Sequence, residues 1–171
     1  AIMTHDDELA LVMRSIASHG QSKKYCYQRI GVNSRLDTLQ AAVLRPKLKR
    51  LDNYIKRRQE AGAYYSVQLM ELDWLITPAC AHYSTHVYHQ YTIRIENGSR
   101  EQLAAYLSER GVPTMIYYPS ALHQSAPYQA GGSSLAVSEE LARSVISLPM
   151  HTELSTGQLR YICDAIKSFR P

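Results

Sequence analysis

The fold of this chain is decided by a stretch that reads Gly31-Val32-Asn33-Ser34-Arg35-Leu36-Asp37 and then Leu39-Gln40-Ala41-Ala42-Val43-Leu44. It is a polar elbow that leads directly into an amphipathic helix, and Gly31 and Asn33 can take backbone conformations that other residues avoid. Ser34, with Asp37 three residues later, predicts a capping box. The start of the helix would then present free N–H groups beside Asn33 and Arg35, which predicts a site for a phosphate or another anion.

The helix that follows the elbow is predicted to be long. Apolar residues recur through it at helical spacing, at Leu44, Leu48, Leu51 and Ile55. The pattern extends from Ser34 to about Leu72, and Pro46 should kink the helix because proline lacks an N–H and clashes with the preceding turn. A helix of this length is typical of a structural spine or of a connector between domains.

A shorter helix is predicted upstream of the elbow. Thr4, with Asp7 at the third helical position, would cap a helix that runs to about Ser18. Its buried stripe would consist of Leu9, Met13 and Ile16. Gly20 ends this helix, and residues 20–33 form a polar loop whose length favours a functional or interface role.

The first predicted strand covers residues 87–95, where apolar and polar residues alternate. His89 is predicted to pack as a strand residue. Alternation places His86 and His89 on opposite faces of the strand, so they are not a chelating pair. The sequence therefore predicts no metal site.

Further helices and one more strand complete the pattern. Asn97-Gly98 turns the chain, and Ser99 opens a helix that Gly111 stops. The remaining elements are a strand at 112–117, a loop with the tip Gly131-Gly132-Ser133-Ser134, a helix from Ser138 to about Ser147, and a helix capped by Ser155 and Gln158 with Leu159, Ile162, Ile166 and Phe169 at helical spacing. Together the elements predict an α+β fold in which helices cover a small sheet.

The composition is that of one folded domain. The chain has 171 residues, and its 45% hydrophobic content is enough for a real core. No apolar run reaches the roughly 18–20 residues of a membrane span, and Ala1-Ile2-Met3 reads as a buried strand cut from its neighbours rather than as a signal sequence. The three cysteines are far apart, which favours reduced thiols and a cytoplasmic location.

The formal net charge of the chain is +4. Basic residues cluster along the long helix, at Arg45, Lys47, Lys49, Arg50, Lys56, Arg57 and Arg58. They are interpreted either as a solvated helix face or as residues that attract an anionic substrate such as a nucleotide diphosphate. Nucleic-acid binding is not predicted, because aromatic residues do not interleave the cluster and no nucleic-acid motif is present. The motifs of serine hydrolases, P-loop enzymes and zinc sites are absent as well.

The elbow motif, G-V-N-S-R-L-D-x-L-Q-A-A-V-L, closely resembles the segment that opens the C-terminal part of the nucleotide-sugar aminotransferases of the DegT/DnrJ/EryC1/StrS family. These are fold-type-I enzymes that use pyridoxal 5'-phosphate. The same likeness continues, in the same order, in Thr4–Ala10, His19–Gln21, His86–Tyr91, Ile116–Pro119 with Leu122-His123, and Ser147–Met150. The Tyr-Tyr-Pro and His-Gly-Gln-Ser variants look most like the branch that acts on UDP-linked N-acetylated sugars for surface polysaccharides such as O-antigen.

The resemblance implies the small C-terminal domain of a fold-type-I aminotransferase. Residues 1–33 would be a remnant of the large cofactor-binding domain with an interface loop, and residues 34–171 the small domain with its connector helix. The family's Schiff-base lysine would lie upstream of Ala1. None of the six lysines in this chain has the expected context. The chain alone is therefore expected to be inactive, with no catalytic residue of its own.

The resemblance also implies roles for individual residues. Asn33 would reach across a homodimer to the cofactor phosphate of the other subunit, and Arg35 would contact a substrate carboxylate or diphosphate. Substrate contacts are also expected from His19, Tyr25, Tyr117, Tyr118 and His123. The structural alternatives are a turn residue for Asn33, an interface salt bridge for Arg35, and surface groups or a core tyrosine pair for the others.

Two functions remain open from the sequence. The first is the C-terminal part of a homodimeric, cytoplasmic aminotransferase that moves an amino group, with glutamate as donor, to a keto nucleotide-sugar. The alternative is a non-catalytic binding or assembly module derived from the same family. Neither reading includes nucleic acid or a membrane as a partner.

Overall fold

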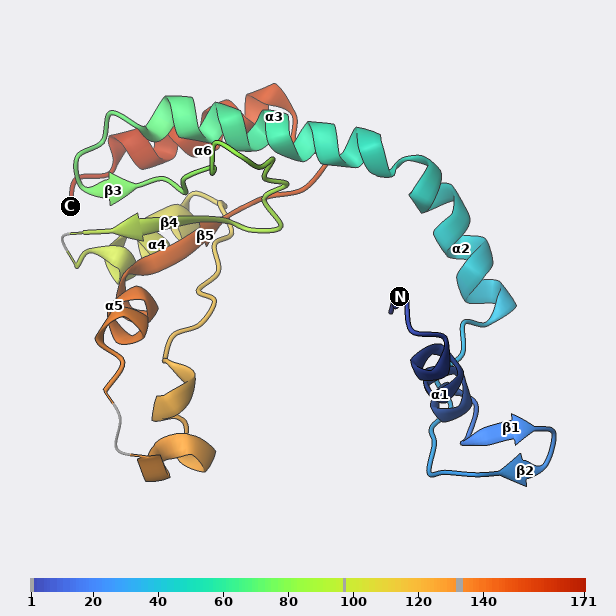
Figure 1. The fold of residues 1–171 in the computed structure, drawn as a ribbon. Helices are drawn as coiled ribbons and strands as arrows, with labels where there is room; N and C mark the ends of the chain where they lie inside the picture. Colours follow the sequence, from blue (N-terminus) through green and yellow to red (C-terminus); the bar gives the residue numbers. More distant parts are fainter. Residues whose placement is uncertain (1, 97, 132–133) are drawn as a thin grey trace. The chain divides into compact units, whose positions relative to one another are not determined.

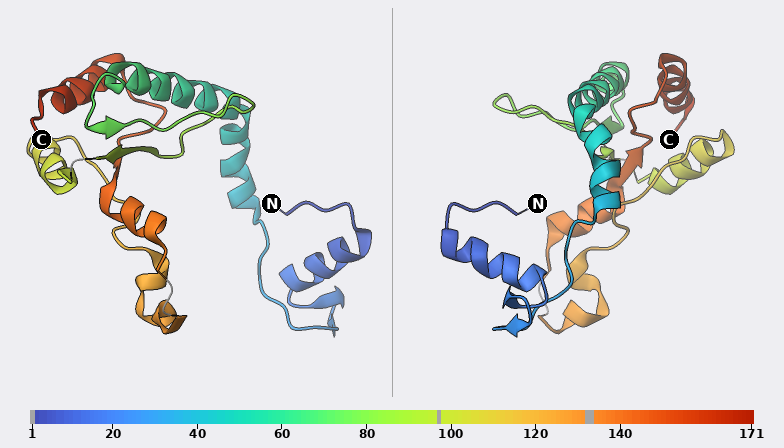
Figure 2. Two further views of the ribbon diagram at one scale, coloured as in Figure 1. Left: turned by 60° about the vertical axis from the view of Figure 1, so that its left-hand side comes forward. Right: turned by 90° about the vertical axis from the view of Figure 1, so that its right-hand side faces the viewer.

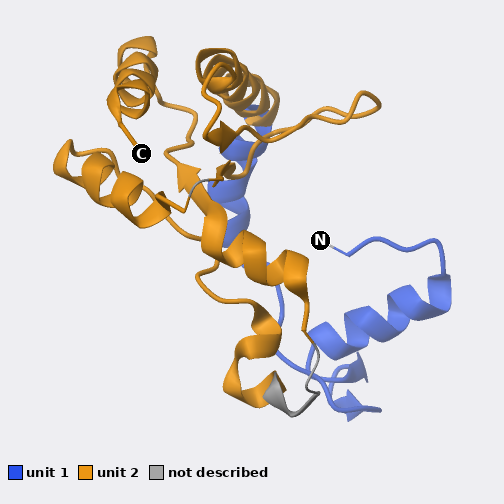
Figure 3. Ribbon diagram, turned by 90° about the vertical axis from the view of Figure 1, so that its left-hand side faces the viewer, with its two compact units in different colours: residues 1–50 blue, residues 51–171 orange. Residues whose placement is uncertain are grey.

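The structure, a computed structural model, describes residues 2–96, 98–131 and 134–171 (Figure 1). The predicted features that involve Ala1, Asn97, Gly132 and Ser133 lie outside the described residues. The chain divides into two compact units, Ala1–Arg50 and Leu51–Pro171, which Figure 3 distinguishes by colour. No helix in the described ranges combines the length and the apolar character needed to cross a membrane.

The first unit begins with α1, Asp7–Ala17. Its N-cap is Asp6, whose carboxylate accepts a hydrogen bond of 2.9 Å from the Leu9 amide, whereas the predicted cap, Thr4, accepts from the Asp6 amide. The predicted buried stripe is wrong, because Leu9 is 46% exposed and Ile16 is 39% exposed. The described residues of this unit leave that face of α1 uncovered.

The predicted loop 20–33 contains a two-stranded antiparallel hairpin, β1 (Gln21–Lys23) and β2 (Cys26–Tyr27). Gly20 has φ +78°, and a Cβ there would lie 1.8 Å from the carbonyl oxygen of Arg29. A Cβ on Gly31 would lie 2.1 Å from the amide nitrogen of Gly20. The chain can therefore cross itself at this point only because both residues are glycines.

The predicted long helix after residue 34 is present as two consecutive helices, α2 (Thr38–Lys49) and α3 (Leu51–Leu69). They are separated at Arg50, four residues after Pro46, where the Arg50 amide donates to the Lys47 carbonyl at 3.1 Å. This shorter-range hydrogen bond tightens the last turn of α2 and ends it. Pro46, at which the sequence predicts a kink, lies inside α2, and the helix is interrupted four residues later, at Arg50.

The second unit is built on a three-stranded antiparallel sheet with the order β3-β4-β5: Leu75–Ile76, Tyr91–Ile95 and Val145–Leu148. The alternation predicted for β4 is confirmed from Tyr91 to Ile95, where alternate side chains are buried. The preceding residues 87–90 are not a strand, because Tyr88 has φ +47°. His89 is exposed, so its predicted packing is wrong.

Residues 136–148 divide between a helix and a strand. The predicted helix through Ser147 is instead α5 (Ala136–Ser144), followed at once by β5. The sequence of β5, Val-Ile-Ser-Leu, is rich in β-branched residues and pairs in register with β4. The predicted strand at 112–117 is reduced to a single bridge, in which Met115 and Ser147 exchange two backbone hydrogen bonds.

Helices cover the sheet, as predicted. α3 and α6 (Thr156–Ser168) lie side by side along one face of it (Figures 1 and 2), and α4 (Arg100–Glu109) packs against both β5 and α6. Two short 3-10 helices, Leu122–Gln124 and Ala126–Gly131, precede α5. The largest fully buried side chains are Tyr65, Tyr91, Leu69, Ile93, Ile95, Leu103, Leu107, Ile146, Ile166 and Cys163. The α+β fold class is confirmed.

Candidate functional site

The elbow that the sequence singles out lies in the first unit and is anchored to the end of α1. The Val32 amide donates to the Ile16 carbonyl at 2.8 Å, and the Ser34 amide donates to the Ala17 carbonyl at 2.9 Å. Asn33 forms an isolated bridge with Ser18. Because these bonds satisfy carbonyls that the end of α1 leaves open, the elbow has a fixed backbone.

The backbone amides of Ser34 and Asp37, in the elbow, already have hydrogen-bond partners. The predicted free helix N–H groups at Ser34 are wrong, since its amide is bonded to Ala17 and the helix starts only after Asp37. The Asp37 amide is itself bonded to Gln40 Oε1 at 3.0 Å. Among its side chains, the elbow can offer an anion the amide of Asn33 and the guanidinium of Arg35.

Asn33 and Arg35 are brought together. Arg35 Nε donates to Asn33 Oδ1 at 3.3 Å. This bond occupies the oxygen of the Asn33 amide, so its NH2 group and the terminal nitrogens of Arg35 are the groups left to meet an oxyanion. Both residues are exposed within their unit. Such a pair suits a phosphate or a carboxylate.

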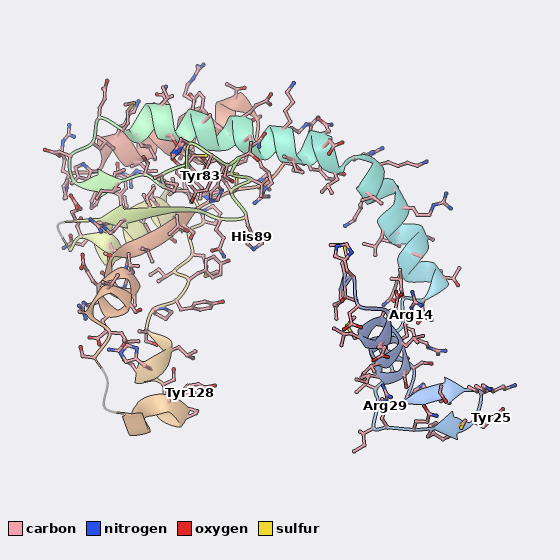
Figure 4. All side chains as sticks on the ribbon, viewed as in Figure 1. Arg14, Tyr25, Arg29, Tyr83, His89 and Tyr128 are labelled. Carbon is pink, nitrogen blue, oxygen red and sulfur yellow. The ribbon has the colours of Figure 1, made fainter. Side chains whose placement is uncertain are left out.

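His19 and Tyr25 flank the elbow in the same unit. His19 has φ +60°, and its amide donates to the Val32 carbonyl at 3.0 Å, directly beside Asn33. Tyr25, at the turn between β1 and β2 (Figure 4), is 75% exposed, and Lys24 Nζ lies 5.1 Å from its ring centroid. The structure therefore places the His19 backbone next to the elbow and Tyr25 at the tip of the hairpin.

Tyr117 lies in the second unit, at a pocket of about 220 Å³ where β4 begins and β5 ends. The walls of this pocket come from three segments: His89 and Gln90, residues 113–117, and residues 147–150. The ring of Tyr118 stands almost perpendicular to that of Tyr117, with centroids 6.1 Å apart, and is 74% exposed. The sequence did not single out Gln90, and it assigned His89 to a packed strand.

His123 is held by a carboxylate. Its Nε2 lies 3.0 Å from Glu139 Oε1, and the same oxygen accepts hydrogen bonds from Ser134 Oγ and the Leu135 amide. These donors hold the pKa of Glu139 below its ordinary value, with the bond to His123 as the largest cause. Nothing in the sequence pattern pairs His123 with Glu139, which lies sixteen positions later.

Arg58 is a further residue that the sequence grouped with the basic helix face. It donates to three consecutive backbone carbonyls, those of Val87, Tyr88 and His89, at 3.2, 2.6 and 2.6 Å. A guanidinium has five N–H donors in a fixed fork, which is why one side chain can serve three acceptors. The pocket wall that contains His89 (labelled in Figure 4) is thereby tied to α3.

The chain's own residues fit part of a pyridoxal phosphate site. The exposed amide of Asn33 and the guanidinium of Arg35 suit a phosphate, as argued above. The six lysines are Lys23, Lys24, Lys47, Lys49, Lys56 and Lys167, and all of them are exposed. None of them lies in the part of the sequence that lines the Tyr117 pocket.

The chain is similar to known proteins over almost its whole length. The profile of the DegT/DnrJ/EryC1/StrS aminotransferase family matches residues 1–167. The UDP-2-acetamido-2-deoxy-3-oxo-D-glucuronate aminotransferase of Pseudomonas aeruginosa is 43% identical over 166 residues, which cover 97% of this chain and 45% of that protein.

Solved structures have the same fold. The structure of S. venezuelae DesV is 35% identical with a TM-score of 0.89, covering 96% of this chain and 45% of that one. The structure of NtdA from Bacillus subtilis, described with bound cofactor PMP, has a TM-score of 0.88 at 26% identity and covers 96% and 40%. The chain spans less than half the length of these relatives. It belongs to the DegT/DnrJ/EryC1/StrS family of pyridoxal phosphate-dependent aminotransferases.

Proposed function

We propose that these residues form the C-terminal part of an aminotransferase that converts a keto nucleotide-sugar into an amino sugar. Glutamate is the proposed amino donor, the cytoplasm the proposed location, and surface polysaccharide such as O-antigen the proposed destination of the product. The general reaction is supported by the family and by the name of the relative from Pseudomonas aeruginosa.

The observation that carries the proposal is the pair of Asn33 and Arg35 on a backbone fixed to α1. Asn33 would donate from its NH2 group to the cofactor phosphate bound by the other subunit of a homodimer. Residues 1–33 would then belong to the large domain and its interface, and residues 34–171 to the small domain. In support, α2 buries no side chain within this chain, as expected of a helix that another surface covers.

The substrate contacts follow from the same residues. The relative from Pseudomonas aeruginosa is named for a glucuronate substrate. If the sugar of this protein is also a uronic acid, Arg35 would bind its carboxylate through two parallel N–H donors. Tyr117 and Tyr118 would offer the sugar apolar ring faces and polar hydroxyl groups. His123, His19 and Tyr25 complete the proposed substrate contacts.

Pyridoxal phosphate supplies the electron sink through which an amino group is moved between carbon atoms. The residues of this chain would bind and orient: Asn33 holds the phosphate end, and Arg35 and the tyrosines hold the sugar. The lysine that the chemistry requires is proposed to lie outside these 171 residues. The chain alone would then be inactive.

The test is borohydride reduction of the protein expressed from its native gene, incubated with pyridoxal phosphate and followed by peptide mass mapping. The expected result is a reduced adduct on one lysine outside residues 1–171, together with amino transfer to UDP-2-acetamido-2-deoxy-3-oxo-D-glucuronate. No adduct on any lysine, in a protein that is folded by circular dichroism, would overturn the proposal and leave the non-catalytic module.

A further inference from the structure

One face of α3 contacts two of the three segments that line the Tyr117 pocket, here called its first wall (His89 and Gln90) and its second wall (residues 147–150). Arg58, Gly62 and Tyr65 are spaced by four and three residues, so they form one stripe along the helix. Each of the three meets the backbone or a ring of a segment that lies far away in the sequence. The first unit takes no part in these contacts.

Arg58 fixes the first wall. Its three hydrogen bonds to the carbonyls of residues 87–89 hold a stretch in which Tyr88 has φ +47°. A left-handed tyrosine costs free energy and persists only when its surroundings determine it. Because the carbonyls are turned toward Arg58, the His89 side chain is left to line the pocket.

Gly62 makes room for the same wall. A Cβ at this position would lie 2.4 Å from Cδ2 of the Tyr88 ring, which is buried and stacked on His86 with ring centroids 4.4 Å apart. The ring can therefore approach α3 this closely only because residue 62 has no side chain.

Tyr65 fixes the second wall. Its hydroxyl donates to the carbonyl of Pro149 at 2.9 Å, across 84 positions of sequence. Burial raises the pKa of Tyr65, so the hydroxyl stays protonated and keeps its role as donor. Pro149 and its neighbours Leu148 and Met150 line the pocket beside His89 and Gln90, since Leu148 pairs with Tyr91.

We propose that Arg58, Gly62 and Tyr65 are positioning residues that hold two of the three wall segments of the Tyr117 pocket against α3 and so set the fit of the pocket to the sugar ring. The inference rests on the proposed function, because the sugar is the ligand for which the pocket is set. None of the three would touch the sugar; they act through His89, Gln90 and Pro149.

The test uses Tyr65→Phe and Arg58→Lys in the full-length protein, with Tyr64→Phe and Arg57→Lys as controls at the neighbouring positions of α3. Tyr65→Phe removes one hydroxyl, and Arg58→Lys keeps the charge but loses the fork. The donor half-reaction is measured with glutamate alone, and the sugar half-reaction with UDP-2-acetamido-2-deoxy-3-oxo-D-glucuronate. In parallel, methyl NMR signals of Met115 and Met150, which line the pocket, are recorded on the same full-length proteins.

We expect KM for the sugar to rise about tenfold in both variants, the effect of one lost positioning hydrogen bond, with the glutamate half-reaction within about twofold of the original. We expect the Met150 signal to move in Tyr65→Phe but not in Tyr64→Phe. Equal losses in both half-reactions, or an unchanged sugar KM in folded variants, would overturn the positioning role.

The outcomes separate the two proposals. If the original protein transfers no amino group and forms no lysine adduct, the proposed function fails. The NMR signals then decide the geometric part by themselves: unmoved Met115 and Met150 signals in both variants overturn the tie between α3 and the pocket walls.

Discussion

Glu139 Oε1 accepts hydrogen bonds from both His123 Nε2, at 3.0 Å, and the Leu135 amide, at 3.1 Å. Glu139 lies in the first turn of α5, and His123 lies in the 3-10 helix Leu122–Gln124. One carboxylate therefore joins two elements through residues that are sixteen positions apart, and it orients a histidine for which a substrate contact is proposed.

The Glu139 carboxylate should contribute to the stability of the fold, and this contribution should be lost in acid. The pKa of Glu139 lies below the ordinary 4.5 in the folded state, chiefly because of His123, so its stabilisation is complete above that value and is lost as pH falls through the folded pKa. We expect Glu139→Gln to be less stable than the original above about pH 5, with the difference shrinking at lower pH. Urea unfolding at a series of pH values measures this. A difference that grows toward acid would contradict the assignment, and Glu140→Gln, at an exposed neighbour, is the control.

The N-terminus of α6 should depend on its capping box. The Gln158 amide donates to Ser155 Oγ at 3.2 Å, and the Ser155 amide donates to Gln158 Oε1 at 2.9 Å. Ser155→Ala should lower the free energy of unfolding by about 1 kcal/mol. Urea denaturation of the chain gives the value, with Ser138→Ala inside α5 as a control that lacks a capping position. Equal effects of the two substitutions would mean that the box does not hold the helix.

The core beneath α6 should be sensitive to cavities. Ile166 is fully buried, so Ile166→Ala should cost about 2–5 kcal/mol from lost burial and the space left behind. Val67→Ala on α3 removes a side chain that is 63% exposed and should change stability by less than about 0.5 kcal/mol. Thermal and urea unfolding of both variants provide the comparison. Similar midpoints for the two would show that α6 does not pack as described.

Asn33 should govern cofactor affinity in the full-length protein. Removing a hydrogen bond to a charged group costs about 1.5–3 kcal/mol, so Asn33→Ala should weaken pyridoxal phosphate binding by roughly 10- to 100-fold. Absorbance titration of the apo-protein with the cofactor measures the change. Asn53→Ala, on the exposed surface of α3, should bind as the original does. If both variants bind alike, Asn33 does not contact the phosphate.

Features set by local chemistry could be read from the sequence. The helix α6 was predicted correctly because Ser155 and Gln158 form a complete cap and the apolar positions that follow keep one period. The burial pattern of β4 could be predicted because its apolar residues also keep one period, that of a strand. By contrast, β5 was missed because four residues following a helix acquire strand character only through their pairing with β4.

In the candidate site, too, contacts between residues close in sequence could be predicted and contacts between distant residues could not. Asn33 and Arg35 are close in sequence, and their hydrogen bond follows from a local turn. The hydrogen bond between Tyr65 and Pro149 spans 84 positions, so no local pattern could indicate it. In the sequence, Arg58 is one of several basic residues along a helix and resembles part of a solvated face. Only its hydrogen bonds to three backbone carbonyls distinguish it from its neighbours.

The exposed helix α2 has a thermodynamic consequence for the elbow before it. A helix of 12 residues is marginal in water without packing, and within this chain α2 has none of its side chains buried. The bonds to α1 fix the elbow at Val32 and Ser34, so it is Arg35, three residues before α2 begins, whose order depends in part on whatever surface covers α2. Anion binding at Arg35 and coverage of α2 are coupled to that extent, and each then strengthens the other by the same factor. Diluting the protein until that cover dissociates would then weaken its hold on the anion, although no residue of the elbow had changed.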